Sequence, residues 1–261
     1  MAEAIRKSVW APRITQLALL LSLGGVAAAL ISAIGSGQGA WQFRTGFIIL
    51  RYALFAAAAG ALLALVGLVL ARRRRAAKLA ALNLLALVAG LGFVLYLGSQ
   101  IRTARTVPAI HDIATNLDDL PQFQALQVRA DNLENIPDND DPKLKALDPE
   151  SLWKSLHRAG YSDLRTVELP WTPAETIERA KRLAEKRGWD IARADSKAGM
   201  LEATDTTLFF RFKDDVVLRA RPNPAGSGSL VDMRSISRVG GSDVGLNAKR
   251  IRAFLADLQA S

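Results

Sequence analysis

Three long apolar runs fill most of the first hundred residues. Residues 14–34 carry no charge, residues 47–71 carry a single arginine, and residues 79–98 carry no charge and one asparagine. At 1.5 Å per residue, each run is long enough to cross a hydrocarbon core about 30 Å thick. The pattern therefore predicts an all-α bundle of three membrane-spanning helices within residues 1–106.

The first run has an alternative interpretation as a cleaved signal peptide, because Arg6 and Lys7 precede it and small residues follow it. Its length exceeds the roughly 7–15 apolar residues that are usual in signal peptides. Two further apolar runs also follow it along the chain. We therefore expect the first run to be retained as a span.

Small residues recur at intervals of four in the second and third runs, at Ala56, Gly60 and Ala64 and again at Ala86 and Gly90. This spacing lets helices pack closely in lipid. None of the three runs contains an acidic residue, which argues against an ion-coupled transporter. We expect the runs to form a compact anchor, alone or with a partner.

The cations around the runs predict how the chain crosses the membrane. Because Lys and Arg collect on the cytoplasmic side, the basic segments before the first run and between the second and third runs should be cytoplasmic. Their basic residues are Arg6, Lys7 and Arg13, and Arg72, Arg73, Arg74, Arg75 and Lys78. Arg44, Arg102 and Arg105 oppose this orientation but are outnumbered. An odd number of spans then places residues 107–261 in the periplasm, beyond the inner membrane of a bacterium.

After residue 106 the pattern changes to that of a folded extramembrane domain, residues 107–261. Helical spacing predicts helices over residues 148–159, 173–187 and 243–258, with Asp148 as the cap of the first and Thr172 and Glu175 as a capping box for the second. A period of two predicts strands over residues 164–173, 189–194, 200–212, 216–221 and 230–238, with a tight turn at residues 213–215. This order predicts an α+β domain, in which an antiparallel sheet carries helices on one face.

The net charge of +9 does not indicate a nucleic-acid-binding protein, because it belongs to the membrane region. Up to Thr106 there are 12 basic residues and one acidic residue, whereas the rest of the chain has 22 basic and 24 acidic residues. The extramembrane domain is therefore nearly neutral, and it shows no basic stripe interleaved with aromatic residues. We expect no nucleic-acid partner.

The chain offers little for metal chemistry. It has no cysteine and only two histidines, His111 and His157, which are too few for a multi-histidine zinc site. Asp138, Asp140 and Asp141 lie in an acidic stretch that lacks the glycine and closing glutamate of a calcium-binding EF-hand loop. We interpret this stretch as a surface loop, and we expect neither a bound metal nor a cofactor.

Residues 230–258 hold the candidate binding site. Arg234 and Arg238 lie two pleats apart on a predicted strand, so they project to the same face, and a glycine-rich turn then leads to a helix start that can bind an anion. The alternative is structural, with acidic partners for the arginines, a capping serine and glycines that only make the turn; such arrangements are commoner than sites. The candidate ligand-binding residues are Arg234, Arg238, Gly240, Gly241, Ser242, Asn247 and Arg250.

For catalysis the sequence offers His111 and Asp232 as possible acid–base groups, with Ser235 or Ser237 as nucleophiles. Asp112 follows His111, but neighbours on an extended chain point to opposite faces, so Asp112 is poorly placed to orient the imidazole. The chain has no nucleophile elbow, phosphate-binding glycine loop or dinucleotide fingerprint. We therefore assign no catalytic residue and interpret His111 as structural.

Three blocks of the extramembrane domain resemble the DUF1499 family, a bacterial and plastid domain of unknown function. The blocks are IHDIATNLDD, GMLEATDTTLFFRFKDDVVLR and VDMRSISRVGGSDVGLNAKRIRAF, and they occur in this order within residues 107–258. Members of the family occur alone or attached to membrane spans, so the resemblance implies a domain boundary near residue 107. It implies no activity and no catalytic role for any residue.

Taken with the predicted topology, these patterns indicate a multi-pass inner-membrane protein of the cell envelope. Besides the lipid bilayer, we expect its periplasmic domain to bind an anionic or amphiphilic ligand, such as a lipid, or another envelope protein, without catalysis. Two alternatives stay open. One is a hydrolase-type enzyme acting on an envelope substrate, and the other is an accessory subunit of a larger membrane complex.

Overall fold

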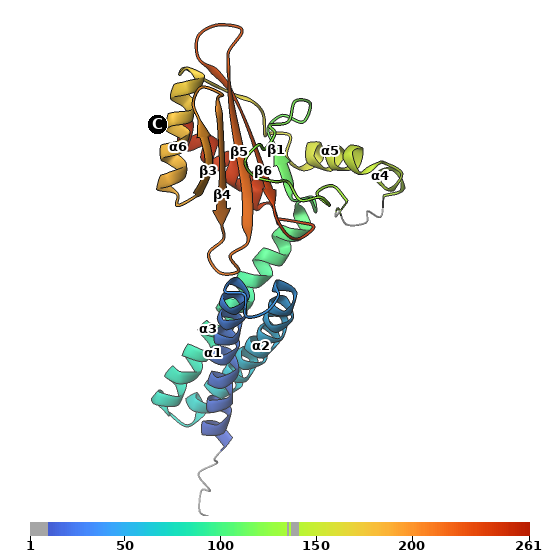
Figure 1. Ribbon diagram of the computed structural model, residues 1–261. Coiled ribbons are helices and arrows are strands. Elements are labelled where there is room, and N and C mark those ends of the chain that lie inside the picture. Colours follow the sequence, from blue (N-terminus) through green and yellow to red (C-terminus); the bar gives the residue numbers. More distant parts are fainter. Residues whose placement is uncertain (1–9, 135, 137–140) are drawn as a thin grey trace, which may run out of the picture. The chain divides into compact units, whose positions relative to one another are not determined.

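A computed structural model of the chain describes residues 10–134, 136 and 141–261 (Figure 1). The chain forms two compact units. The N-terminal unit extends to Arg102 and includes residues 208–211, and the C-terminal unit comprises residues 103–207 and 212–261. The basic residues Arg6 and Lys7 and the acidic residues Asp138 and Asp140 lie outside the described residues.

The N-terminal unit consists of three long helices, α1 (Trp10–Gly37), α2 (Phe43–Arg73) and α3 (Ala77–Thr106). They have 28, 31 and 30 residues, and their most apolar windows have mean hydropathies of 2.4, 2.5 and 2.2. Each helix contains one of the predicted apolar runs and is long enough to cross a membrane. The prediction of three candidate membrane-spanning helices is therefore confirmed.

Small residues line the contacts between these helices, as their spacing predicted. Gly60 and Ala86 are buried, and a Cβ atom added at Gly60 would lie 2.5 Å from the backbone nitrogen of Ser22. Asn83 is buried as well, and its Nδ2 donates to Oγ1 of Thr15 at 2.8 Å. Close packing and a side-chain hydrogen bond are the two forces that join helices in lipid.

The C-terminal unit is built on a six-stranded antiparallel sheet. Its strands are β1 (Asp112–Ala114), β2 (Val167–Leu169), β3 (Asp190–Asp195), β4 (Met200–Thr206), β5 (Lys213–Pro222) and β6 (Ser229–Ser237). The strand order is β1-β6-β5-β4-β3, and β2 also pairs with β6. Ala114 of β1 is opposite Arg234 and Val167 of β2 is opposite Val231, so β1 and β2 follow each other along one side of β6.

Four helices accompany the sheet, α4 (Pro142–Lys145), α5 (Pro149–Gly160), α6 (Pro173–Lys186) and α7 (Leu246–Gln259). As predicted, the side chain of Asp148 caps α5, and a capping box of Thr172 and Glu175 opens α6. Helices α6 and α7 pack against the same face of the sheet. The predicted α+β class, with helices on one face, is therefore confirmed.

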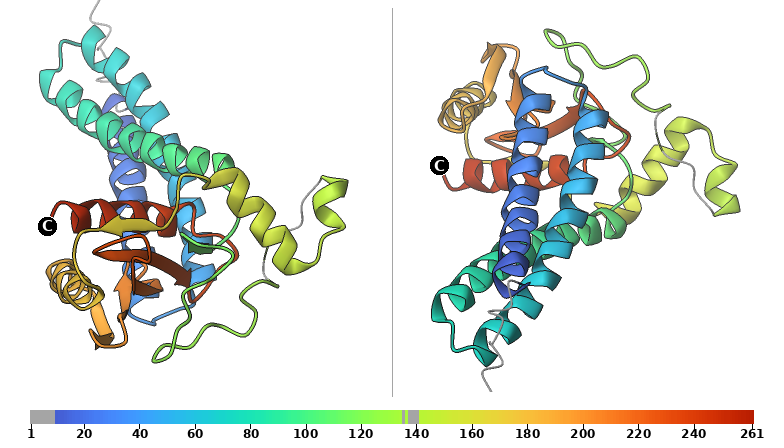
Figure 2. Two further views of the ribbon diagram at one scale, coloured as in Figure 1. Left: turned by 90° about the horizontal axis from the view of Figure 1, so that it is seen from above. Right: turned by 90° about the horizontal axis from the view of Figure 1, so that it is seen from below.

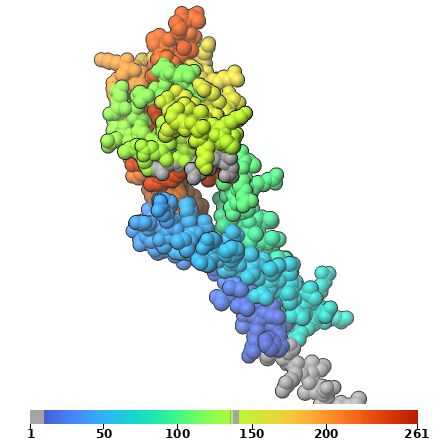
Figure 3. Space-filling model, turned by 90° about the vertical axis from the view of Figure 1, so that its right-hand side faces the viewer, coloured from blue at the N-terminus to red at the C-terminus, as the bar shows by residue number. Residues whose placement is uncertain are grey.

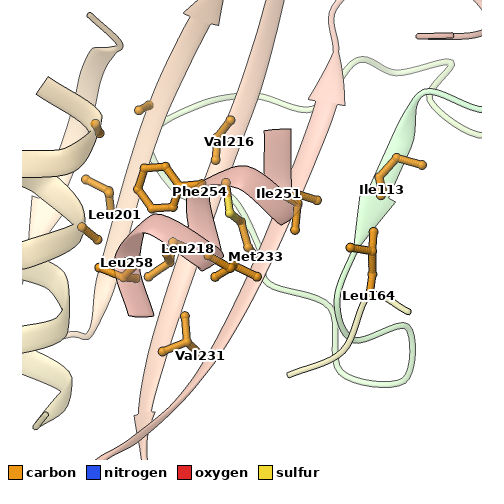
Figure 4. Packing of buried hydrophobic residues seen from close by; sticks show 14 of the residues in the cluster. Ile113, Leu164, Leu201, Val216, Leu218, Val231, Met233, Ile251, Phe254 and Leu258 are labelled. Atoms are coloured by element: carbon orange, nitrogen blue, oxygen red, sulfur yellow. The ribbon is translucent and has the colours of Figure 1, made fainter. Parts of the chain in front are cut away.

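The hydrophobic core lies between this face and the two helices. Phe254 of α7 is fully buried, and its ring stacks on Trp189 with the ring centroids 4.8 Å apart. Burying one such side chain stabilises a fold by about 1.5–3 kcal/mol. Figure 4 shows the apolar side chains of the strands and of α7 that meet here, among them Leu201, Val216, Leu218, Val231, Met233, Ile251, Phe254 and Leu258.

The opposite face of the sheet is covered by an irregular segment, residues 115–131, which we call the strap. Viewed along the strands, the strap and α7 lie on opposite sides of the sheet (Figure 2, left). This face of the sheet is polar rather than apolar, since the strands send many charged side chains to it. Among them are Asp112, Arg193, Glu202, Asp215, Arg219, Arg221, Asp232, Arg234 and Arg238.

The predicted turn between β4 and β5 is wrong. We expected a tight turn at residues 213–215, but β4 ends at Thr206 and β5 begins at Lys213, so that the turn lies at residues 207–212. Asp214 and Asp215, read as turn formers, are strand residues that are only 2% and 5% exposed. The turn was not recognised because its residues are as apolar as those of the strand before it.

Candidate functional site

The seven predicted ligand-binding residues do not converge on one site. In β6, Val231 and Met233 belong to the core beside α7. Arg234 and Arg238 are an odd number of positions away from them, so both lie on the opposite face. They share one face as predicted, and the strap covers this face. Asn247 and Arg250 lie on α7, on the other face of the sheet. The sheet itself therefore separates the two groups.

Arg234 is buried, and its guanidinium group forms hydrogen bonds with partners within the chain. Its Nε and Nη2 donate to the two carboxylate oxygens of Asp112 at 2.9 and 2.6 Å, and its Nη1 donates to the carbonyl oxygen of Pro121 at 3.4 Å. The residue is 7% exposed and Asp112 is 1% exposed. The bidentate pair joins β1 to β6, and the bond to Pro121 joins the strap to β6. This agrees with the structural alternative, in which the arginine has an acidic partner within the chain.

Arg238 is also paired, but its side chain remains 41% exposed. Its Nε and Nη2 donate to Asp215 at 2.8 Å each, and Nη2 also donates to Oγ1 of Thr204 at 3.1 Å. The hydrogen bonds that Arg238 donates to Asp215 raise the pKa of Arg238 above its ordinary value. Arg238 is therefore a permanent cation with one side open to solvent.

On the helix face, Arg250 and Asn247 form a closed polar cluster at one end of the core. Arg250 donates to Asp205 at 2.8 Å and to Asp214 at 2.6 Å, and it also contacts Oδ1 of Asn247. The Nδ2 of Asn247 donates to the carbonyl oxygen of His111 at 2.8 Å. These buried donors and acceptors satisfy one another, so the cluster fixes α7 on the sheet.

The glycine turn before α7 serves the chain itself. The helix begins at Leu246 and not at Asp243 as predicted, because Gly245 before it adopts a left-handed conformation with φ of +79°. The capping acceptor is Asp243 and not Ser242, since its carboxylate accepts the N–H groups of Gly245 and Asn247 at 2.8 and 2.7 Å. Burial raises the pKa of Asp243 to about 6. The anion expected at this helix start is thus a carboxylate of the chain.

Asp232, one of the two possible acid–base groups, is locked in an ionic network. It is fully buried, and its oxygens accept hydrogen bonds from Arg221 at 2.7 Å and Arg219 at 3.2 Å. The hydroxyl groups of Thr166 and Thr115 also donate to it, at 2.6 and 3.3 Å. Four donors from within the chain therefore occupy the oxygens of Asp232, so that its side chain serves the packing of the sheet.

His111, the other possible acid–base group, is 1% exposed. Within the described part of the chain, neither ring nitrogen makes a hydrogen bond of normal geometry. Burial, and secondly the nearby charge of Arg129, lower the pKa of His111. The carboxylate of Asp112 bonds to Arg234 and Asn132, so it does not orient the imidazole, as the sequence predicted.

A cavity of about 180 Å³ opens between the strap and the sheet, and we call it the strap cavity. Ile236 and Phe123 give it an apolar lining, and two arginines, Arg129 and Arg238, stand beside them. Of the predicted site residues, Arg238 lines the cavity, and Gly240 lies next to it because its carbonyl oxygen accepts a hydrogen bond from Arg129 at 2.7 Å. The full lining is Phe123, Gln127, Val128, Arg129, Asp215, Ile236, Ser237 and Arg238.

The strap residues that line this cavity were not predicted from the sequence. Phe123, Leu126 and Val128 are apolar residues in a segment without helical or strand periodicity. Apolar residues in such a segment are usually buried against another part of the protein. Their presence was the one signal in the sequence that could have indicated the strap.

The strap is held down chiefly by Glu202 of β4, which is fully buried. Its two carboxylate oxygens accept the backbone N–H groups of Gln124, Ala125 and Leu126 at 2.8–3.1 Å. Asp119 of the strap is bound by Arg219 and Arg221 of β5. In the space-filling view of Figure 3, the green and yellow-green surface from the strap to α5 covers much of the C-terminal unit.

In the part of the chain that the structure describes, no group of three or more His, Asp or Glu side chains is arranged to hold a metal ion. Asp141, from the acidic stretch considered for calcium, instead caps α4 by accepting the N–H of Lys143 at 2.9 Å.

Comparison with known proteins gives one match. The model of the family described as protein of unknown function (DUF1499) matches residues 112–258, more than half of the chain. No curated protein and no solved structure matches the chain. The matched residues run from the first strand of the sheet to the end of α7, so they contain the strap, the cavity and both polar clusters.

Proposed function

Given that the chain belongs to the DUF1499 family, we propose its function from the anchor and the strap cavity. It is a non-catalytic membrane protein of the bacterial cell envelope. Its extramembrane domain binds the anionic end of an amphiphile, such as a lipid headgroup with a short apolar segment, in the strap cavity.

The observation that carries this proposal is the combination of lining groups in the cavity. Ile236, Phe123 and Val128 offer apolar contact, and the open side of Arg238 offers a cation within the same space. Binding pockets generally combine an apolar lining with a few polar groups that fix orientation. The volume of about 180 Å³ lies below the roughly 300–1,000 Å³ of pockets that enclose drug-sized ligands, so one end of an amphiphile fits better than a whole lipid.

The charge distribution supports the periplasmic side for this domain. Five basic residues lie in or beside the short connection of α2 to α3: Arg72, Arg73, Arg74, Arg75 and Lys78. With these held in the cytoplasm, three spans carry residues 107–261 to the other side of the inner membrane.

Binding without chemistry fits the candidate site better than the enzyme alternative. Asp232 is buried and bound by four hydrogen-bond donors of the chain, and His111 has its pKa lowered by burial and lacks a carboxylate to orient it. A base and a nucleophile within hydrogen-bond reach of each other are the minimum for a hydrolase of the serine type.

Native mass spectrometry of the full chain, extracted from bacterial membranes in a mild detergent, tests the proposal. We expect a reproducible adduct on the wild-type protein. Val128→Trp fills the cavity from the strap side and should abolish the adduct, since Val128 lines the cavity. The matched control is Gln122→Trp, because Gln122 is an exposed strap residue that does not line the cavity.

Two outcomes would contradict the proposal. One is a wild-type mass without any adduct, and the other is an adduct that survives Val128→Trp as well as Gln122→Trp.

A further inference from the structure

The hairpin that joins β4 to β5 ends in an unusual apolar tip. Residues 208–211 read Leu-Phe-Phe-Arg, and Leu208 is 80% exposed and Phe209 47% exposed. Hairpin turns of soluble proteins usually contain Gly, Asn, Asp or Pro. Residues 207–212 contain none of these.

The tip is nevertheless well defined. The N–H of Thr207 donates to the carbonyl oxygen of Phe212 at 2.9 Å, and the N–H of Phe212 donates to Oγ1 of Thr207 at 2.8 Å. Arg211 has a φ of +52°, a left-handed conformation that is uncommon for a residue other than glycine. A formed turn thus presents two large apolar side chains to the surroundings.

The tip is grouped with the long apolar helices. Residues 208–211 belong to the N-terminal unit, and the ring of Phe210 packs on that of Phe47 in α2, with the ring centroids 5.0 Å apart. Asp214, next to the turn, is opposite Ser237, and the N–H of Ser237 donates to the carbonyl oxygen of His111 at 3.2 Å. His111 directly precedes β1. The segment before β1 and the base of the hairpin therefore lie at the same end of the sheet.

The contact with Phe47 brings the tip to the level of a bilayer surface. Phe47 is the first residue of the second apolar run, in the candidate span α2. A span enters the hydrocarbon core where its apolar run begins. The surface of the bilayer is therefore within reach of the tip, which packs on this residue.

From these observations we propose that the hairpin tip inserts Leu208 and Phe209 into the interface of the bilayer that anchors the chain. The exposed cations Arg211 and Lys213 follow the apolar pair and can bind lipid phosphates. The surface is therefore a second, shallow membrane contact of the extramembrane domain, independent of any ligand in the strap cavity.

Single-cysteine labelling of the full chain tests this contact, since the natural sequence has no cysteine. Phe209→Cys carries an environment-sensitive nitrobenzoxadiazole label, and the protein is reconstituted in phosphatidylcholine vesicles with phosphatidylglycerol. We expect blue-shifted emission and quenching by lipids that carry a nitroxide near the headgroup. Ser227→Cys, in the exposed loop at the other end of β5, is the control and should emit as in water.

Either of two results would overturn the proposal. A label at residue 209 that is as accessible to aqueous iodide as the label at residue 227 would show that the tip stays in solvent. A blue shift without quenching by nitroxide lipids would show that the side chain at residue 209 contacts protein and not lipid.

Discussion

At the scale of single residues, the three arginines predicted to bind a ligand each form an ion pair within the chain. Arg234 is paired with Asp112, Arg238 with Asp215, and Arg250 with Asp214. Removing one partner of a buried ion pair leaves an uncompensated charge, which costs far more than the loss of an exposed pair. Stability and ligand affinity can therefore be separated by mutation.

Arg234→Ala should lower the free energy of unfolding by about 3–5 kcal/mol, because it leaves the carboxylate of Asp112 buried without its charge partner. Arg252→Ala is the control, since its pair with Asp163 is 43% and 56% exposed and should contribute no more than about 1 kcal/mol. Thermal unfolding of the full chain, followed by tryptophan fluorescence, measures both. An Arg234→Ala protein that melts like the wild type but loses a bound adduct would make this arginine a ligand-binding residue.

The sequence predicted correctly that the two arginines of β6 share one face of the sheet, but it could not predict which carboxylates they bind. The period of a strand placed Arg234 and Arg238 on one face, and the structure places both there. Their carboxylate partners are separated from them by 122 and 23 positions, so no local spacing could identify Asp112 or Asp215. Ion pairs of this kind are fixed by the register of the sheet, which is a long-range property.

At the scale of elements, the parts that follow local rules were predicted and the parts that depend on tertiary contacts were not. Helix α6 was predicted from its own cap, Thr172 with Glu175. The strap has no such rule, because its backbone donors are satisfied by Glu202, a residue about 77 positions later. The turn after β4 was misplaced for a related reason, since its residues have the composition of a strand.

Glu202→Gln should loosen the strap without unfolding the sheet. The side-chain amide would turn an NH₂ group toward backbone donors that a carboxylate now accepts, and hydrogen bonds to charged groups contribute about 1.5–3 kcal/mol. We expect hydrogen exchange of the amides of Gln124, Ala125 and Leu126 to accelerate at least about tenfold, which corresponds to about 1.4 kcal/mol.

Glu168→Gln is the matched control for this measurement, because Glu168 is exposed on β2. Exchange of the three strap amides that is equal in the two variants would mean that Glu202 does not hold the strap.

At the scale of the whole molecule, the chain combines a strongly basic anchor with a nearly neutral domain. This asymmetry leads to a prediction of topology, because basic residues resist translocation. A phosphatase reporter fused after Thr106 should be active in a bacterial host, whereas the same reporter fused after Arg75 should be inactive. The reverse pattern would place the domain in the cytoplasm and would remove the support for an envelope ligand.

The pairing of β1 with β6 has a consequence for how the domain is made. Asp112 leaves the ribosome early, but its partner Ile236 on β6 is near the end of the chain. The strand that receives β1, β2 and β5 is therefore synthesised last among the strands. Contacts between such distant segments form slowly. The sheet can therefore be completed only after β6 has been synthesised, and until then the edges of the earlier strands are open to aggregation.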